Sequence, residues 1–231
     1  MNLTLTVPVI TIDGPAGTGK GTICHALATH LKWNCLDSGA IYRVFALAVQ
    51  DANRGDTDIA QLCDLANKLD LRFSSDAQKP HQIFLNQRDV TLAIRSEACG
   101  QMASQFAIVP QIRQALLERQ RKFARMPGLV TDGRDMGTVV FPNACLKIYL
   151  NASREERAKR RVLQLHTQGI DVSLAQVVEE LAIRDERDSN RSVAPMRPAA
   201  DAVLIDTTGK SIKEVLEYIL GLVNDRLNRS H

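Results

Sequence analysis

The chain has 231 residues, 45% hydrophobic and 24% charged, which is a globular composition and excludes a disordered chain. Its net charge of only +3 and its 4% aromatic content argue against nucleic-acid binding, because neither a strong basic field nor base-stacking surfaces are available. No apolar run reaches the roughly 18 to 20 residues of a membrane span, and residues 1–4 do not resemble a secretory signal. We therefore expect a cytoplasmic protein that does not bind membranes, and we expect a monomer.

The first part of the chain alternates short β-branched strands with helices, separated by glycine-rich or polar turns. Between residues 70 and 92 the pattern changes to short alternating segments, which predict a small antiparallel sheet. The predicted elements are strands over 7–12 and 34–36, helices over 22–31, 39–52 and 59–69, insert strands over 71–73, 82–85 and 89–90, and helices over 95–104 and 110–125.

The second part continues the alternation. Ser153 is the predicted N-cap of a strongly charged helix that ends near residue 168, and Ser173 precedes a further helix. Alternating strands and helices predict an α/β fold with a central parallel sheet and inserted subregions. The remaining predicted elements are strands over 129–131, 145–150 and 202–205 and a closing helix over 211–227.

The five cysteines are widely spaced, and none belongs to a C-x-x-C pair. Their spacing indicates neither a zinc site nor a disulfide framework. We expect buried thiols in a reducing compartment. They are Cys24, Cys35, Cys63, Cys99 and Cys145.

A glycine-rich segment joins the first predicted strand to the first predicted helix. Gly14, Gly19 and Lys20 satisfy the G-x-x-x-x-G-K pattern of a phosphate-binding loop, in which backbone N–H groups and a helix N-terminus hold phosphate oxygens. The Lys20 ammonium is a flexible positive charge that can follow the β- and γ-phosphates. The predicted nucleotide-binding residues are Gly14, Pro15, Ala16, Gly17, Thr18, Gly19, Lys20, Gly21 and Thr22.

The hydroxyl that usually follows this lysine directly is displaced, because Gly21 precedes Thr22. Thr22 is therefore a candidate Mg²⁺ ligand or a hydrogen-bond donor to a phosphate, and the sequence leaves both open. The ending GKGT resembles nucleoside-monophosphate kinases more than signalling GTPases.

A second polar segment, residues 37–43, begins a helix directly after the second strand. The helix N-terminus, the Ser38 hydroxyl and Arg43 are placed to hold an anion together. The alternative is structural, with Asp37 or Ser38 acting only as an N-cap and Arg43 lying on a solvated face.

A third polar segment, residues 132–137, follows a predicted strand at the sheet edge where ligands of open α/β sheets bind. Asp132 is placed to organise Mg²⁺ through water, and Arg134 is placed to pair with a phosphate. Two carboxylates and an arginine between glycines are difficult to explain as packing.

Arginine recurs at helical spacing along the helices between residues 153 and 198. Two such basic helices predict a lid that encloses phosphates and excludes water, which would otherwise compete for a transferred phosphoryl group. Intrahelical ion pairs are the alternative explanation for each arginine. The residues concerned are Arg154, Arg157, Arg160, Arg161, Arg184, Arg187 and Arg191, accompanied by Asp185 and Asp188.

Four motifs, GPAGTGKGT, LDSGAIYR, DGRDMGTVVFP and RDERDSNRSVAP, resemble the bacterial cytidylate kinase family in their order and spacing, over nearly the whole chain. The resemblance implies a single P-loop domain that phosphorylates CMP and dCMP, with ATP as phosphoryl donor and Mg²⁺ as cofactor. It further implies a core at about 1–37, 126–152 and 199–231, a monophosphate-binding region with its insert at about 38–125, and a lid at about 153–198.

The resemblance also implies roles for individual side chains. Arg43, Arg134 and Arg191 would hold the CMP phosphate, and Arg184 and Asp188 would lie by the ribose. The base would contact Ser104, Arg113 and Asp135, with Ser38 and Tyr42 as further substrate-binding residues; the expected catalytic residues are Lys20, Asp132, Arg134, Arg157 and Arg161.

The cytosine assignment also has a chemical basis. Cytosine presents an N4 amino donor beside the N3 and O2 acceptors. The Asp135 carboxylate can accept from the amino group, while Arg113 and Ser104 can donate to the acceptors. Uracil reverses this edge, so mismatched polar groups would oppose its binding.

Two alternatives to a CMP kinase remain at the level of sequence. The first is another P-loop kinase that acts on UMP, dTMP or shikimate, which initial rates with different acceptors would distinguish. The second is a P-loop GTPase switch, which is disfavoured because the chain contains no N-K-x-D guanine-binding motif.

Overall fold

The computed structural model describes residues 7–52, 58–73, 82–167 and 169–228. Residues 1–4, part of the predicted insert and the predicted helix end at 168 lie outside these ranges. The chain divides into two compact units, the first formed by residues 1–36 and 123–231 and the second by residues 37–122. Within the described ranges, no helix is both long and apolar enough to cross a membrane.

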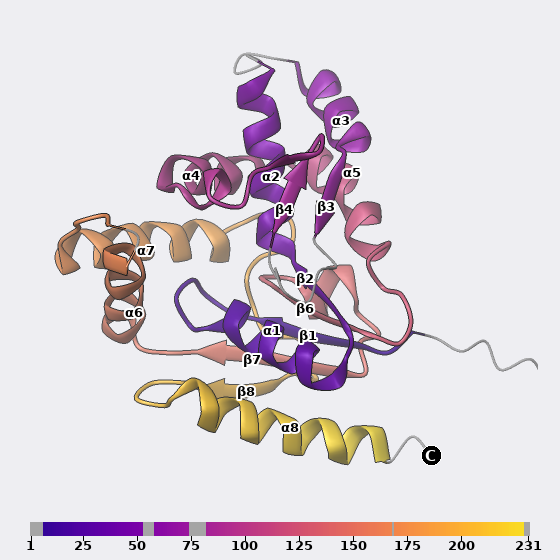
Figure 1. The fold of residues 1–231 in the computed structure, drawn as a ribbon, viewed down its shortest axis with the longest axis vertical. Helices are drawn as coiled ribbons and strands as arrows, with labels where there is room; N and C mark the ends of the chain where they lie inside the picture. The colour runs from indigo at the N-terminus through magenta and orange to yellow at the C-terminus, as the bar shows by residue number, and fades with distance from the viewer. Residues whose placement is uncertain (1–6, 53–57, 74–81, 168, 229–231) are drawn as a thin grey trace, which may run out of the picture. The chain divides into compact units, whose positions relative to one another are not determined.

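The first unit is built on a five-stranded sheet. Its strands, in spatial order, are β2 (Asn34–Asp37), β6 (Leu129–Gly133), β1 (Val9–Asp13), β7 (Leu146–Asn151) and β8 (Val203–Asp206) (Figure 1). β1 runs parallel to both β6 and β7, and β7 runs parallel to β8. Since parallel strands end at the same edge, the segments that follow β1 and β6 emerge together.

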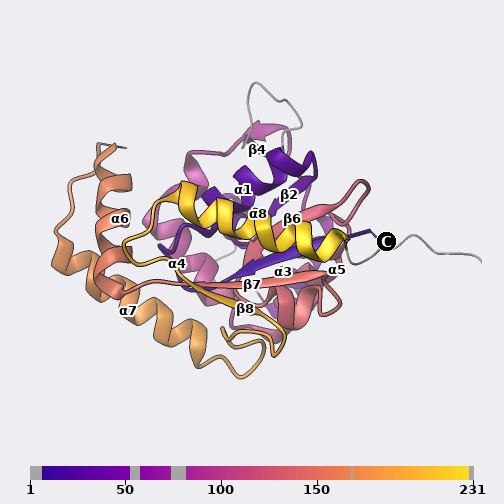
Figure 2. The ribbon, with the colours of Figure 1, turned by 90° about the horizontal axis from the view of Figure 1, so that it is seen from below.

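Helices α1 (Lys20–Leu31) and α8 (Ile212–Asn228) cover one face of this sheet, and Figure 2 shows α8 lying over the strands. Alternate strand side chains such as Ile10, Ile12 and Ile148 form one core with the apolar faces of the two helices. Burial of this apolar surface is the main stabilising contribution in such a layer. A π-helical turn, η2 (Met136–Val140), packs against β1 and β6.

Helices α6 (Arg154–Thr167) and α7 (Leu174–Ser189) also belong to the first unit and pack on one another. We call them the lid helices. The predicted cap is confirmed, because the Ser153 Oγ accepts from a backbone N–H at 3.2 Å. The Ser173 Oγ caps the second lid helix in the same way, at 3.1 Å. The lid helices have a small apolar core that includes Ala158 and Leu181, and Ala16 of the phosphate loop packs against it.

The second unit contains helices and a small antiparallel sheet, as predicted. Its sheet pairs β4 with strands on both sides in antiparallel register. The elements are α2 (Ser38–Asp51), α3 (Ile59–Lys68), β3 (Leu71–Phe73), β4 (Ile83–Leu85), β5 (Arg88–Asp89), η1 (Ala93–Arg95), α4 (Glu97–Phe106) and α5 (Pro110–Arg121).

The predicted α/β fold with a parallel central sheet is confirmed, with differences at element ends. The helix expected over 95–104 begins at Glu97, because the Ser96 side chain caps it by accepting from a backbone N–H at 3.3 Å. The helix expected over 110–125 ends at Arg121, and the Asn34 amide donates to the carbonyl oxygen of Arg125, beyond the helix end, at 2.8 Å. The π-helical turn was not predicted.

Candidate active site

The phosphate loop lies against its neighbours so closely that two of its glycines cannot be replaced without movement. At Gly14 the φ angle is +142°, and an added Cβ would lie 2.0 Å from the carbonyl oxygen of Leu150. At Gly17 the φ angle is +82°, and an added Cβ would lie 2.9 Å from the Cβ of Arg157. The loop therefore takes its shape from β7 and from the first lid helix.

Lys20 folds back over this loop. Its Nζ donates to the carbonyl oxygen of Pro15 at 2.7 Å, and the residue is only 6% exposed. Burial, reinforced by the nearby positive charge of Arg134, lowers the pKa of Lys20 to about 7, although Asp132 opposes the shift. A polyphosphate beside Lys20 would favour its charged form, which suits a residue that binds anions.

Asp13 is a site residue that the sequence analysis missed. Its carboxylate accepts from the backbone N–H groups of Met136 at 2.9 Å and Gly137 at 2.8 Å. Burial raises the pKa of Asp13 to about 6 despite these two hydrogen bonds. The last residue of β1 thus holds the segment that carries Arg134, and a carboxylate ending a buried strand before a phosphate loop was an available signal.

Arg134 and Arg191, both predicted to bind the acceptor phosphate, meet at one carboxylate. The Nε of Arg134 donates to Asp188 at 2.8 Å, and Arg191 donates to the other carboxylate oxygen of the same residue. Burial alone would raise the pKa of Asp188, but Arg134, Arg191 and Arg184 outweigh it and lower the pKa. The predicted phosphate and ribose residues of the first unit therefore form one cluster around the buried Asp188 carboxylate.

Arg157, predicted as a catalytic residue, contacts the phosphate loop, the end of β7 and the second lid helix. Its guanidinium donates to the carbonyl oxygens of Ala16 at 3.0 Å and Ala152 at 3.2 Å. It also pairs with Asp185 of α7 at 2.7 Å, and its side chain is 6% exposed. In this structure Arg157 therefore connects the phosphate loop to the second lid helix.

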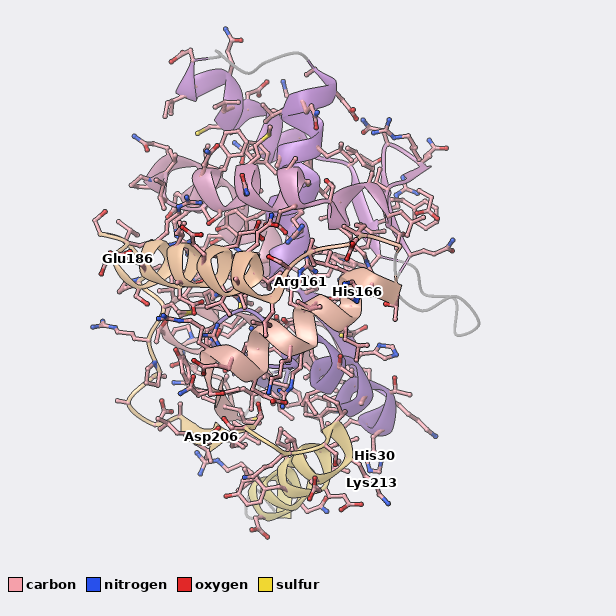
Figure 3. The ribbon with its side chains drawn as sticks, turned by 90° about the vertical axis from the view of Figure 1, so that its left-hand side faces the viewer. His30, Arg161, His166, Glu186, Asp206 and Lys213 are labelled. Carbon is pink, nitrogen blue, oxygen red and sulfur yellow. The ribbon has the colours of Figure 1, made fainter. Side chains whose placement is uncertain are left out.

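Arg161, the other predicted lid residue, lies on α6 (Figure 3). Its Nη1 donates to Gln164 at 3.0 Å, one turn along the same helix. Arg161 is half-buried, unlike Arg157. This contact lies within the helix, but Gln164 is neutral, so the contact is not the ion pair of the alternative explanation.

The candidate Mg²⁺ ligands differ in exposure. Asp132 is buried near the end of β6, opposite Ile12 of β1, and Thr22 is exposed in the first turn of α1. Among the residues that the structure describes, no three His, Cys, Asp or Glu side chains cluster as a metal site. A sparse set of one carboxylate and one hydroxyl fits Mg²⁺, which keeps several waters and binds substrate phosphates.

In the second unit, Arg43 is held in place by carbonyl groups. Its Nη1 donates to the carbonyl oxygens of Ile94 at 2.8 Å and Ser96 at 3.2 Å. An added Cβ on Gly100 would lie 2.7 Å from the Arg43 Nη2, so a helical glycine makes room for the guanidinium. Asp37 does cap α2, accepting from a backbone N–H at 3.0 Å, whereas Arg43 is half-buried and bonded to carbonyl groups.

The predicted base-contacting residues of the second unit are buried. Arg113 is 8% exposed and lies 5.8 Å from the centre of the Tyr42 ring, a cation–π arrangement. Ser104 is 5% exposed, and its Oγ has no hydrogen-bond partner within the described part of the chain. The Ser38 hydroxyl donates to Gln120 at 2.8 Å. Burying a hydroxyl such as that of Ser104 without a hydrogen-bond partner costs stability, and a bound ligand could supply that partner.

A family model described as cytidylate kinase matches residues 10–225. The chain belongs to the cytidylate kinase family. A protein named cytidylate kinase from Stutzerimonas stutzeri (strain A1501) is 55% identical over 222 residues, covering 95% of this chain and 96% of that protein. Another, from Shewanella sp. (strain MR-4), is 51% identical over 225 residues, covering 97% and 98%.

Among solved structures, an uncharacterized protein from Eubacterium ventriosum is similar with a TM-score of 0.53 and 14% identity, covering 95% of this chain and 99% of that one. At this identity the similarity supports the fold alone.

The cytidylate kinase matches confirm the predicted family and enzyme class, a nucleoside-monophosphate kinase that uses ATP. They also support CMP and dCMP as acceptors and lend nothing to the alternative kinases or the GTPase switch.

Proposed function

We propose that the protein transfers the γ-phosphoryl group of ATP directly to the phosphate of CMP or dCMP. An acceptor oxygen forms a new bond to the γ-phosphorus as the bond to the β–γ bridging oxygen breaks, giving ADP and CDP or dCDP. The observation that carries the proposal is that Arg134 and Arg191 meet at the buried Asp188 carboxylate, in the same unit as the phosphate loop with its buried Lys20. Such a transfer needs positioning and charge neutralisation rather than acid–base catalysis.

On the donor side, the loop N–H groups and Lys20 hold the triphosphate. Asp132, through water, and Thr22 would hold Mg²⁺, which supplies charge neutralisation at the phosphates when bound. Arg161 approaches the triphosphate from the lid. Arg157, through its bonds to Ala16 and Asp185, keeps the loop and the lid helix in a fixed relation.

On the acceptor side, Arg134 and Arg191 bind the CMP phosphate together with Arg43. Asp188 holds two of these guanidiniums at a common place before substrate arrives, which lowers the ordering cost of binding. Asp188 and Arg184 also face the ribose. Neutralising the acceptor phosphate allows two anions to approach each other.

Cytosine is read by Asp135, which accepts from the N4 amino group, and by Arg113 and Ser104, which donate to N3 and O2. The Ser104 hydroxyl, buried and without a partner in the described ranges, is poised to donate. The Tyr42 ring holds the Arg113 guanidinium in place, and Ser38, at the start of α2, is a further substrate-binding residue. We also propose that the protein works as a cytoplasmic monomer on small nucleotides, without nucleic acid or membrane partners.

Direct transfer is tested with ATP made chiral at the γ-phosphorus and with CMP as the acceptor. One in-line displacement inverts the configuration, so the label should appear on the outer phosphate of CDP with inversion. Retention would indicate two displacements through a phosphorylated enzyme and would overturn the direct mechanism. Label that appears only in inorganic phosphate would overturn the acceptor assignment.

A further inference from the structure

Two cysteines that are eleven residues apart in the sequence lie side by side in the first unit. The Sγ atoms of Cys24 in α1 and Cys35 in β2 are 3.5 Å apart. We propose that this pair is a reversible thiol–disulfide site that reacts with low-molecular-weight disulfides. The site is separate from the kinase chemistry and does not depend on the proposed function.

The position of the pair decides which thiol reacts first. Side chains alternate along β2, so Cys35 points into the core beneath α1, whereas Leu36 points to the other face of the sheet. Because β2 lies at one edge of the sheet, Cys35 is partly exposed, while Cys24 is fully buried. A reagent disulfide therefore reaches Cys35 first and forms a mixed disulfide there. Cys24 is then in place to displace the reagent thiol from Cys35.

Two of the other thiols are disfavoured as competitors. Cys99 donates to the carbonyl oxygen of Arg43 at 3.2 Å, and Cys145 donates to that of Val9 at 3.1 Å. Burial raises the pKa of both thiols, which lowers the fraction of reactive thiolate. Cys63 lies in α3 of the second unit.

The reaction is a thiol–disulfide exchange in two steps. The Cys35 thiolate attacks one sulfur of the reagent disulfide, so its S–S bond breaks and one reagent thiol leaves. The Cys24 thiol then loses its proton and attacks the Cys35 sulfur, which breaks the mixed disulfide and releases a second reagent thiol. Two protein thiols are oxidised, and one reagent disulfide is reduced to two thiols.

The test is incubation of the full-length protein with oxidised glutathione, followed by thiol titration and intact mass spectrometry. We expect two of the five thiols to be lost, a mass lower by two hydrogen atoms, and one cross-linked peptide that joins residues 24 and 35. Dithiothreitol should restore both thiols. An unreacted protein, a persistent mixed disulfide or a disulfide-linked dimer would each overturn the proposal.

Three variants make the assignment specific. Cys63→Ser should react as the unmodified protein does, whereas Cys35→Ser should retain its thiols. Cys24→Ala should stop after the first step and carry one glutathione on Cys35. Loss of two thiols in Cys35→Ser, or an unlabelled Cys35 in Cys24→Ala, would contradict the assignment.

Discussion

At the scale of single residues, the central observation is that one buried carboxylate holds two arginines. Asp188 pairs with Arg134 and Arg191, and its side chain is 1% exposed. A phosphate that enters this cluster meets guanidiniums that are already desolvated and oriented, so little reorganisation accompanies binding. Arginine suits this task better than lysine because its planar group can pair with a carboxylate and a phosphate at once.

Arg134→Ala is expected to reduce kcat/KM for CMP by about 10²- to 10³-fold, because one of the acceptor guanidiniums is lost. The dissociation constant for ATP should change little, and Arg191 should keep Asp188 paired so that the protein still folds. A coupled assay and a nucleotide titration measure the two effects. Arg121→Ala, at an exposed ion pair, is the matched control and should behave as the unmodified protein does.

Asp13 makes a pH-dependent contribution to stability. Burial raises its pKa from 3.8 to about 6, so between these pH values the folded protein retains a proton that the unfolded chain has lost. The contribution of Asp13 to the free energy of unfolding therefore falls as pH rises from 3.8 to 6 and is constant above that window. Asp13→Asn removes this titration.

Urea unfolding of the protein and of Asp13→Asn at several pH values measures this contribution. As pH rises from 3.8 to about 6, the free energy of unfolding of the unmodified protein should fall relative to that of Asp13→Asn. A difference that does not depend on pH would show that Asp13 is not shifted by burial.

At the scale of elements, Gly100 in α4 makes room for Arg43. Gly100→Ala places a methyl group against the end of a flexible side chain, so the arginine should move rather than the backbone. We expect KM for CMP to rise several-fold with little change in KM for ATP, as steady-state kinetics would measure. Gly221→Ala in α8 meets no atom within 4 Å and should leave both KM values unchanged while stabilising its helix by about 0.5–1 kcal/mol. Equal effects of the two substitutions on KM for CMP would contradict this role.

Arg157 links three elements: the phosphate loop, the end of β7 and the second lid helix. Arg157→Ala leaves Asp185 without this partner, and breaking such a buried pair costs about 3–5 kcal/mol of stability. Asp185→Asn should also destabilise the protein, and the double variant should lose less than the sum of the two single losses. Chemical unfolding of the four proteins measures the coupling; additive losses would mean that the pair does not act as a unit.

At the scale of the whole molecule, the helices and strands whose apolar residues recur at a regular spacing were predictable from the sequence. The β-branched run before Gly14 predicted β1, and the short alternating segments after residue 70 predicted the antiparallel sheet. The phosphate loop was predictable because its glycines and Lys20 are contiguous. A functional site could therefore be predicted from the sequence where the residues that form it are neighbours in the chain.

The contacts that were missed depend on the order of strands and on packing. Asp13 meets the N–H groups of residues 136 and 137 only because β1 lies next to β6 in the sheet, an adjacency that periodicity does not encode. The role of Gly100 depends in the same way on how α4 packs against α2. The proximity of Cys24 and Cys35 requires the position of α1 over the edge strand.

The most direct test of the central claim is the initial rate of ADP formation with CMP, dCMP, UMP, AMP and dTMP, each supplied with ATP and Mg²⁺. The buried donors and acceptor proposed to read cytosine predict that CMP and dCMP are phosphorylated with kcat/KM values at least about 10²-fold above the others. UMP or dTMP turned over as efficiently as CMP, or ADP formed at the same rate without any acceptor, would contradict the assignment.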